Sequence, residues 1–378
     1  MYGFQPKRKL FTKSIIKMIK KIVIFGSGHN TFSNGNFLVN KHIADFLHDL
    51  ANQNLDITFI QRALIESQLT SLNTSIICDN IDIVILDKKS IRSAINVLKT
   101  ILGADFVYIF YPSSWANLVA ILAFFIKKPY GLYIRSSINT QSKLCQFTMR
   151  NSKISNSVQG IGQRLITLYP NIKTIFPMTK TLHFADLNSI KRTVNLDKKL
   201  KVLFVGRVEQ AKGIFELLDA TQKLKNENRG IQLKIVGEGE SQKKVKRYCS
   251  NNKGLDISIE GLVADIQEIL EFYQWADVLV LPTYYEGFPR VLIEGGAMGV
   301  ALVTTSVGGI PFVMEADSDY LSIIPKSSNS IYLALKKLQD DPQLLNRLRI
   351  ASNRFAIDLF NKSESHLELL LAQLVERR

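Results

Sequence analysis

Cysteine is scarce in this chain. Three cysteines occur in 378 residues, and they lie far apart, at Cys78, Cys145 and Cys249. An odd number at wide spacing excludes a disulfide framework and a zinc site made of cysteines. It also indicates a reducing compartment. The length allows two domains of ordinary size.

Long apolar runs are missing as well. The longest, WANLVAILAFFI at residues 115–126, is shorter than the ~20 residues of a membrane-spanning helix. It stops at Lys127, Lys128 and Pro129, which predicts a buried helix that ends before a strand. The first 25 residues contain no apolar core followed by a small-residue cleavage site. We therefore expect a cytoplasmic protein without a transmembrane anchor.

Acidic residues are few in the first half of the chain. Residues 1–190 contain 22 Lys and Arg against 9 Asp and Glu, a balance of +13, whereas the remainder has 26 against 24, a balance of +2. Residues 1–21 carry seven basic residues and no acid. These seven are Lys7, Arg8, Lys9, Lys13, Lys17, Lys20 and Lys21.

Two interpretations of this basic lead segment stay open. One is a solvated tail, and the other is attraction to an anionic surface. In LFTKSIIKMIKK, residues 10–21, the apolar side chains fall roughly on one helical face against lysines. This pattern favours a lipid surface over nucleic acid. We expect peripheral attachment to the inner face of the cell membrane and no nucleic-acid partner.

Buried-strand signals alternate with helical patterns in both halves of the chain, which predicts an α/β fold with parallel sheets covered on both faces. Residues 26–35 are predicted to form a loop and residues 36–53 a helix. The predicted strands are residues 21–25, 55–60, 81–86, 105–111, 129–135, 201–206, 231–237, 255–261, 276–282 and 301–305.

A charged, less apolar segment at residues 187–200 is the predicted linker. It separates an N-terminal domain, residues 1–186, from a C-terminal domain, residues 201–361. Residues 362–378 are predicted to be an amphipathic helix, and whether it crosses back to the N-terminal domain stays open. Ligands of such open sheets bind beyond the carboxyl ends of the strands, so two doubly wound domains facing each other would form a cleft there.

The loops after the strands of the second half carry charged residues and glycines. Arg207 directly follows residues 201–206, and Lys212 stands at the start of the next helix. Two cations beside a helix amino terminus suit a phosphate group, although solvated loop residues have the same pattern. Gly237 and Gly239 allow a close backbone approach, as they also do in ordinary turns.

The loop after residues 301–305 is GGIP, with Gly308 and Gly309, and it can present backbone amides to an anion. YYEGFPRVLIEGGAMG, residues 284–299, places Glu286 at the end of a strand loop. Pro289 is predicted in the first turn of a helix that runs through Met298, with Glu294 about one and a half turns along it.

Carboxylates suit hydroxyl-rich ligands because each one accepts hydrogen bonds from neighbouring hydroxyl groups. Cations for phosphate and carboxylates for hydroxyls together predict a sugar nucleotide as the ligand.

Four segments in the second half carry a resemblance to a known family. FVGRVEQAKG, IVGEGE, YYEGFPRVLIEGGAMGV and TTSVGGIP resemble, in order and spacing, the C-terminal domain of family 4 retaining glycosyltransferases with the GT-B fold. The resemblance is specific over roughly residues 200–320. In the other half, GLYIRSS at residues 131–137 is similar to a segment of some surface-polysaccharide members.

The resemblance implies transfer of a sugar, with retained configuration, from a UDP-, GDP- or ADP-sugar to a hydroxyl of a saccharide acceptor in polysaccharide or glycolipid synthesis. It implies that Arg207 and Lys212 bind the donor diphosphate, that Glu286 binds hydroxyls of the donor sugar and that Glu294 binds the ribose. The acceptor is expected to be lipid-linked. The other donor-binding positions implied are Gly206, Gly237, Gly239, Gly287, Phe288, Gly26 and Gly28.

FGSGHNTFSNG, residues 25–35, is similar to the first glycine-rich loop of the family. A dinucleotide-binding fingerprint is the alternative, but the third glycine in register is missing. Many members have a histidine after an N-terminal-domain strand, where this chain has residues 133–137 and no histidine. The acceptor-side candidates are Arg135 and His29, with a structural salt bridge and an exposed loop histidine as the alternatives.

No metal is expected, because Arg207 and Lys212 supply the positive charge a metal would provide. The D-x-D string at residues 317–319 lies beyond the motifs. Two other functions stay open. A sugar-nucleotide epimerase of the same fold needs an acid–base cluster that the loops do not show. A non-catalytic, membrane-docked binding protein would not need the intact set of two cations and two carboxylates.

Overall fold

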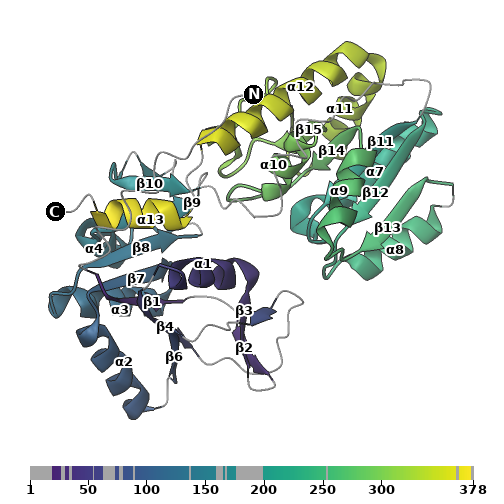
Figure 1. The fold of residues 1–378 in the computed structure, drawn as a ribbon. Coiled ribbons are helices and arrows are strands. Elements are labelled where there is room, and N and C mark those ends of the chain that lie inside the picture. The colour runs from purple at the N-terminus through teal and green to yellow at the C-terminus, as the bar shows by residue number, and fades with distance from the viewer. Residues whose placement is uncertain are drawn as a thin grey trace, which may run out of the picture. The chain divides into compact units, whose positions relative to one another are not determined.

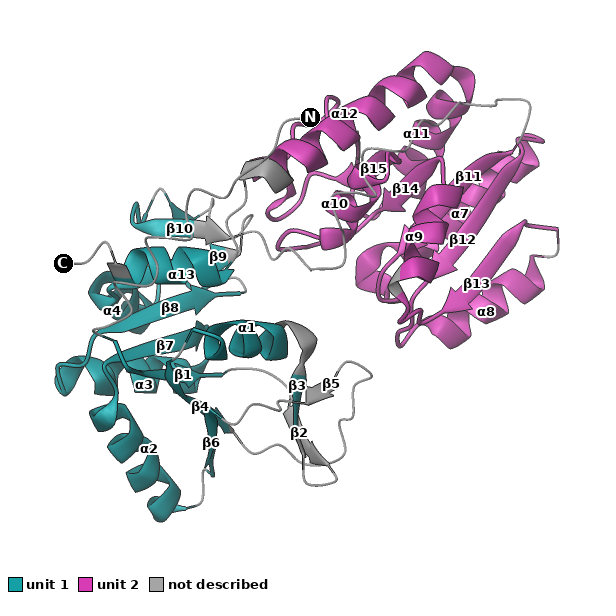
Figure 2. Ribbon diagram, viewed as in Figure 1, with its two compact units in different colours: residues 1–177, 364–378 teal, residues 178–363 magenta. Residues whose placement is uncertain are grey.

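The computed structural model divides the chain into two compact units, residues 1–177 with 364–378 and residues 178–363 (Figure 2). Each unit is described by itself. The structure describes residues 19–26, 30–33, 36–53, 55–62, 73–75, 80–87, 90–135, 138–158, 165–166, 168–175, 199–252, 254–362 and 366–375. The predicted linker, apart from residues 199–200, and most of the basic lead segment lie outside these ranges.

Unit 1 is built on a seven-stranded sheet in the order β10-β9-β8-β7-β1-β4-β6, with every pair parallel (Figure 1). Its central strands are continuous apolar runs, as expected for a sheet covered on both faces. The strands are β1 (Lys21–Phe25), β4 (Asp56–Arg62), β6 (Ile81–Leu86), β7 (Phe106–Tyr111), β8 (Tyr130–Ile134), β9 (Ile154–Val158) and β10 (Ile172–Ile175).

Helices cover both faces of this sheet. On one face, α1 (Lys41–Ala51) and α13 (His366–Val375) share a core with β1, β4 and β7. On the other face lie α2 (Ile91–Gly103), α3 (Ser114–Phe125) and α4 (Lys143–Asn151). Serine side chains accept backbone N–H bonds at the starts of α2, α3 and α4, which is the usual way to satisfy the first turn.

A small antiparallel sheet corrects two predictions. Residues 26–35 were predicted as a loop and 36–53 as a helix, but β2 (Asn30–Ser33) and β3 (Asn36–Asn40) form a hairpin, and β5 (Asn73–Ser75) pairs with β3. The reason lies in NFLVN, a short apolar run between two asparagines, which fits a strand as well as a helix. Its Phe37 and Val39 are buried in the core that α1 also joins.

Unit 2 repeats the plan with a six-stranded parallel sheet in the order β13-β12-β11-β14-β15-β16. The strands are β11 (Leu200–Val205), β12 (Ile231–Val236), β13 (Ile257–Gly261), β14 (Val278–Leu281), β15 (Ala301–Thr305) and β16 (Leu321–Ile323). The helices are η1 (Gln210–Lys212), α7 (Ile214–Asn226), α8 (Gln242–Asn251), α9 (Ile266–Trp275), α10 (Arg290–Ala297), η2 (Ile310–Phe312), α11 (Ser328–Asp340) and α12 (Pro342–Lys362).

Both large sheets are doubly wound, as predicted, and each predicted strand is present with its ends shifted by at most a residue or two. β9, β10 and β16 were not predicted from the sequence. Within residues 362–378, predicted to be a helix, the structure has α13, and α12 ends at Lys362. The prediction that residues 115–126 form a buried helix is half wrong. α3 is a helix, but Leu118, Phe124 and Phe125 on its outer side are exposed.

Candidate functional site

The candidate site lies at the carboxyl ends of four neighbouring strands of unit 2. The order of strands reverses between β11 and β14, which is where ligands of doubly wound sheets bind. Arg207 and Lys212 follow β11, and Glu286 follows β14. The loops after β12 and β15 flank them. The sheet therefore gathers four of the predicted motifs at one edge, although they are spread over roughly a hundred residues of the chain.

An ion pair joins the two loops at the switch point. Lys212, the last residue of η1, pairs with the carboxylate of Glu286. Both side chains are mostly buried, with 15% and 21% of their surface exposed. The backbones are joined too, because the Tyr284 N–H donates to the carbonyl of Ala211 at 2.9 Å. Lys212, predicted to bind the diphosphate, and Glu286, predicted to bind the sugar, are thus direct neighbours.

Arg207 lies on the same loop but is oriented differently. Its guanidinium pairs with Glu209 at 2.8 Å, and the side chain is 72% exposed. Arg207 and Lys212, both predicted to bind phosphate, therefore lie on one loop but form separate ion pairs. An exposed arginine on such a loop keeps the freedom to rotate toward an anion.

The loop after β15 is packed against Glu286. Gly308 has a φ of +60°, and a Cβ there would lie 1.7 Å from the Glu286 carbonyl oxygen. The N–H of Gly309 donates to the same oxygen at 3.3 Å. Only glycine fits this left-handed position against another backbone. The GGIP segment thus positions the backbone at Glu286.

The glycines after β12 have a similar role toward the loop after β11. A Cβ on Gly237 would lie 2.0 Å from the carbonyl oxygen of Gly206, and one on Gly239 would lie 2.4 Å from that of Val208. The close approach that these glycines allow in this structure is therefore between two backbones. Their contact with a donor stays a prediction, as does that of Gly287 and Phe288 between β14 and α10.

Glu294 lies on α10, which begins at Arg290, one residue after Pro289, and ends at Ala297. Pro289 therefore precedes the first turn instead of occupying it. The Oε2 atom of Glu294 accepts a hydrogen bond of 2.8 Å from the hydroxyl of Tyr273, a fully buried residue of α9. Burial first, and Glu294 second, raise the pKa of Tyr273 well above its usual range.

Tyrosines are the site residues that could not be predicted from the sequence. Besides Tyr273, Tyr284 donates to Glu216 Oε1 at 2.5 Å and so ties the loop after β14 to α7. Neither the Tyr273–Glu294 pair nor the Tyr284–Glu216 pair could be predicted, because tyrosines and acidic residues far apart in a sequence are common. Only the fold brings them together.

In unit 1, the predicted residues fall after β1 and β8. Gly26 is buried, and its N–H donates to the carbonyl of Ile60 at 2.9 Å. Gly28 and His29 lie outside the described residues. The Arg135 guanidinium stands over the ring of Phe110 at 5.3 Å, and burial lowers its pKa. These positions at the acceptor side stay predictions.

A histidine lies close to Arg135 after all, although it comes from the other end of the chain. His366, the first residue of α13, stacks on Phe46 with ring centroids 4.2 Å apart and lies 4.0 Å from the ring of Tyr133. Its Nε2 is hydrogen-bonded to the Tyr108 hydroxyl at 2.9 Å. Burial and the nearby Arg135 lower the pKa of His366 to about 3. The ring is neutral and part of the packing.

Metal-ligand clusters are absent from the described residues. The two carboxylates of the D-x-D string accept hydrogen bonds from backbone N–H groups. Asp319 accepts from Glu315 at 2.9 Å, and Asp317 accepts from Ser322 at 3.3 Å. Helices long and apolar enough to cross a membrane are likewise absent from the part of the chain that the structure describes.

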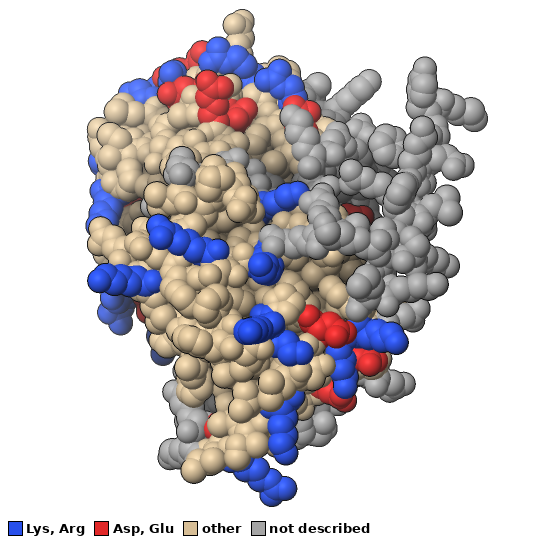
Figure 3. Space-filling view, turned by 90° about the vertical axis from the view of Figure 1, so that its left-hand side faces the viewer, with Lys and Arg blue, Asp and Glu red and all other residues tan. Residues whose placement is uncertain are grey.

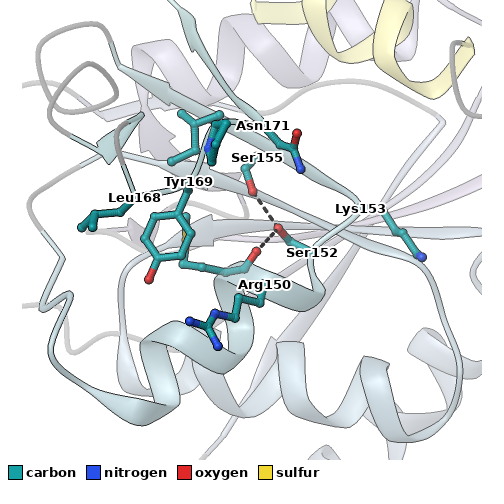
Figure 4. A pocket seen from close by; sticks show the side chains of 10 residues that line it. Arg150, Ser152, Lys153, Ser155, Leu168, Tyr169 and Asn171 are labelled. Carbon is teal, nitrogen blue, oxygen red and sulfur yellow. Dashed lines mark hydrogen bonds between the residues drawn. The ribbon is translucent and has the colours of Figure 1, made fainter.

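A pocket of about 210 Å³ lies at the amino ends of β9 and β10, the edge of the sheet opposite the acceptor-side loops (Figure 4). Ser152 and Ser155 are joined there by a 2.6 Å hydrogen bond between their hydroxyls. Arg150, Lys153 and Tyr169 also line it. The pocket is basic and does not belong to the predicted donor site.

Comparison with solved structures defines the class of fold. The Anabaena protein HepE, in complex with UDP, superposes with a TM-score of 0.66 over 95% of this chain and 99% of that protein, at 14% sequence identity. At this identity the likeness shows the fold alone. With the two doubly wound sheets, it identifies the GT-B fold, as the sequence predicted.

The sequence comparison finds a family match in the second part of the chain. Residues 187–355 match the model of the family described as glycosyl transferases group 1. This match covers the whole predicted site of unit 2 and somewhat less than half of the chain, so the second part of the chain is similar to that family.

Two curated relatives extend the match. Glycogen synthase of Mycobacterium tuberculosis is 30% identical over 159 residues, which are 42% of this chain and 38% of the relative. N,N'-diacetylbacillosaminyl-diphospho-undecaprenol alpha-1,3-N-acetylgalactosaminyltransferase of Campylobacter jejuni is 25% identical over 254 residues, which are 64% of this chain and 65% of the relative. The chain thus aligns with well under half of the first relative and about two thirds of the second.

Proposed function

We propose that this chain is a retaining glycosyltransferase that moves a sugar from a nucleoside-diphosphate sugar to a hydroxyl of a lipid-linked saccharide. The observation that carries the proposal is the ion pair of Lys212 and Glu286 at the switch point of unit 2. A cation for the diphosphate and a carboxylate for the sugar hydroxyls stand side by side there, where a bound nucleotide sugar would have its reacting bond.

In the proposed reaction the bond between the sugar C1 and the diphosphate oxygen breaks while the acceptor oxygen bonds to C1 from the same face. The acceptor proton passes to an oxygen of the departing diphosphate. Lys212 and Arg207 stabilise the charge that develops on the leaving group. Glu294, held by Tyr273, accepts hydrogen bonds from the ribose hydroxyls. No metal is needed for this charge balance.

The name of the Campylobacter relative supports a lipid-linked acceptor, because it specifies a diphospho-undecaprenol acceptor for that protein. HepE was solved with UDP and with UDP-glucose, which supports a nucleotide-sugar donor here. We place the reaction at the inner face of the membrane, in polysaccharide or glycolipid synthesis, where an acceptor of this kind is accessible to a protein that binds anionic lipid.

The donor site is tested by thermal unfolding in the presence of nucleoside diphosphates and their sugars. We expect one nucleotide to raise the melting temperature of the wild type, because a ligand that binds only the folded state stabilises it. Glu294→Ala should remove most of that rise. The control Glu271→Ala changes an exposed glutamate on α9 and should keep it. A wild type that no nucleotide stabilises at millimolar concentration contradicts the donor site.

Transfer is tested next, with the selected donor and lipid-linked saccharides. A product that keeps the anomeric configuration of the donor supports the retaining reaction, and an inverted product contradicts it. Conversion of the donor without any acceptor would favour the epimerase alternative. Binding without turnover under every condition would favour the non-catalytic alternative.

A further inference from the structure

α3 lacks a charged face. Between Ser114 and Ile126 the chain has no charged residue. The fully buried side consists of small or branched residues, Trp115 and Leu122 pack partly against the same core, and other bulky residues are exposed. The residues of α3 that are buried are Ala116, Val119, Ala120 and Ala123. The solvent-facing side of a surface helix is normally polar. The apolar outer side of α3 therefore suggests contact with something other than water.

The outer side of α3 continues onto α4. Leu118, Phe124 and Phe125 of α3 are 54%, 39% and 73% exposed, and Leu144 of α4 is 44% exposed. Phe124 and Phe147 join the two helices, with ring centroids 4.9 Å apart. We call these five residues the α3–α4 face. Its aromatic and aliphatic side chains form one apolar area on two helices of the same unit.

The stretch of sequence that contains this face carries charge of one sign. From residue 106 to residue 185 the sequence contains no Asp or Glu, while it contains nine Lys and Arg. Those that the structure describes near the ends of α3 and α4 are Lys127, Lys128, Lys143, Arg150 and Lys153. Figure 3 looks onto the side of the molecule where α3 and α4 lie, and it shows a largely uncharged surface with scattered Lys and Arg side chains and fewer Asp and Glu side chains.

We propose that the α3–α4 face docks on a membrane that contains anionic lipids. Phe125, Phe124 and Leu118 would enter the boundary between headgroups and acyl chains, and the flanking cations would lie at the level of the lipid phosphates. Exposed Phe and Leu at the centre with Lys and Arg at the rim is the pattern of a protein that lies on a bilayer without crossing it. A nucleic-acid surface would need the cations at the centre instead.

The pocket beside α4 supports the same orientation. Arg150 belongs to α4 and also lines the pocket, together with Lys153. The charged ends of these two side chains point in different directions (Figure 4), so each of them could meet a separate lipid phosphate at the rim of the docked face. The carboxyl ends of the strands, where the acceptor is expected, lie at the opposite edge of the sheet and stay clear of the lipid. The choice of a membrane as the partner rests on the proposed function. The location of the docking face rests on the geometry of unit 1.

The test measures binding of the full chain to vesicles by sedimentation. Vesicles of phosphatidylcholine with phosphatidylglycerol should bind the wild type, and phosphatidylcholine alone should bind it far more weakly. The double variant Leu118→Glu, Phe125→Glu should lose at least about tenfold in affinity for the anionic vesicles, because it places two charges where apolar side chains meet the bilayer. The matched control is Leu333→Glu on α11, since Leu333 is 53% exposed and Leu118 is 54% exposed.

Three results would overturn the docking face. One is wild-type binding by the double variant, which would place the lipid contact elsewhere, for example on the basic lead segment. Another is equal binding of the wild type to both kinds of vesicle. The third is binding of the wild type to RNA and not to vesicles. Unfolding followed by the fluorescence of Trp115 in a Trp275→Phe background checks that unit 1 of the double variant is folded, and nucleotide stabilisation keeps a failure of docking distinct from a failure of the donor site.

Discussion

The carboxylate of Glu294 is held by a tyrosine that otherwise belongs to the core of unit 2. Tyr273 is fully buried, and its hydroxyl meets Glu294 Oε2 at 2.8 Å. A carboxylate bonded in this way has one oxygen fixed and the other available to a ligand. We infer that Tyr273 is a positioning residue for the proposed ribose contact.

Tyr273→Phe removes only that hydroxyl. Since a hydrogen bond to a charged group contributes ~1.5–3 kcal/mol, we expect affinity for the selected nucleoside diphosphate to fall by about tenfold. Isothermal titration calorimetry measures this loss. Tyr332→Phe is the control, because Tyr332 of α11 donates to Glu227, a surface residue that follows α7, in the same manner. Equal affinities of the two variants would contradict the positioning role.

Gly308 permits a second prediction at the residue scale. A Cβ on Gly308 would meet the Glu286 carbonyl oxygen, while Gly299 has a similar φ of +67° and a Cβ there would meet no atom within 4 Å. Gly299→Ala should therefore cost only the left-handed strain, ~1–2 kcal/mol. Gly308→Ala should cost more, and it should also weaken nucleotide-sugar binding by displacing Glu286. Thermal unfolding and sugar-nucleotide titration of both variants test this difference, and matching losses would contradict it.

At the scale of elements, α13 is the clearest case of a helix whose place the sequence could not give. It follows unit 2 in the chain but packs in unit 1, where Leu369, Leu370 and Leu371 join the core with α1. Its first residue, His366, packs against the rings of Phe46 and Tyr133. The helix therefore contributes to the stability of unit 1 through both its apolar residues and this ring.

The pH dependence of unit 1 follows from His366, whose pKa is lowered to about 3 in the folded state from ~6.5 in an unfolded chain. The folded state binds the proton less well, so this contribution is complete above pH ~6.5 and is lost as the pH falls toward ~3. The facing groups are Tyr108, Tyr133 and Arg135. Between pH ~6.5 and ~4.5 we expect a loss of about 2 kcal/mol in the free energy of unfolding.

Urea unfolding in a Trp275→Phe background measures this loss, because Trp115 of unit 1 is then the remaining tryptophan of the two in the chain. His366→Gln, which cannot titrate, should flatten the pH dependence over the same interval. If the free energy of unfolding changed equally with pH in the wild type and in His366→Gln, the pH dependence would not come from His366.

At the scale of the whole molecule, the two units share one plan and differ in charge and in chemistry. Unit 2 carries the Lys212–Glu286 pair and the glycine loops at the carboxyl edge of its sheet. Unit 1 carries the α3–α4 face on its outside, within an acid-free stretch of the sequence at residues 106–185. The proposed functions divide accordingly, with donor recognition in unit 2 and membrane contact in unit 1.

The strands and the donor motifs were predictable because their signals are local. A buried parallel strand is a short apolar run, and a glycine loop with Arg207 and Lys212 is read directly from neighbouring residues. The hairpin of β2 and β3 was missed because a short apolar run between asparagines does not distinguish a strand from a helix, and the pairing of β3 with β5, more than thirty residues later in the chain, has no local signal. Short edge strands such as β16 have equally weak local signals.

The sequence by itself determined that the chain forms doubly wound α/β units and which loops hold the cations, carboxylates and glycines of the site. Only the tertiary structure decided that Lys212 pairs with Glu286, that Tyr273 holds Glu294, that α13 returns to unit 1 and that the outer side of α3 is exposed. The physical reason is that periodicity and turn chemistry act between near neighbours, whereas partners and burial depend on contacts between segments far apart in the chain.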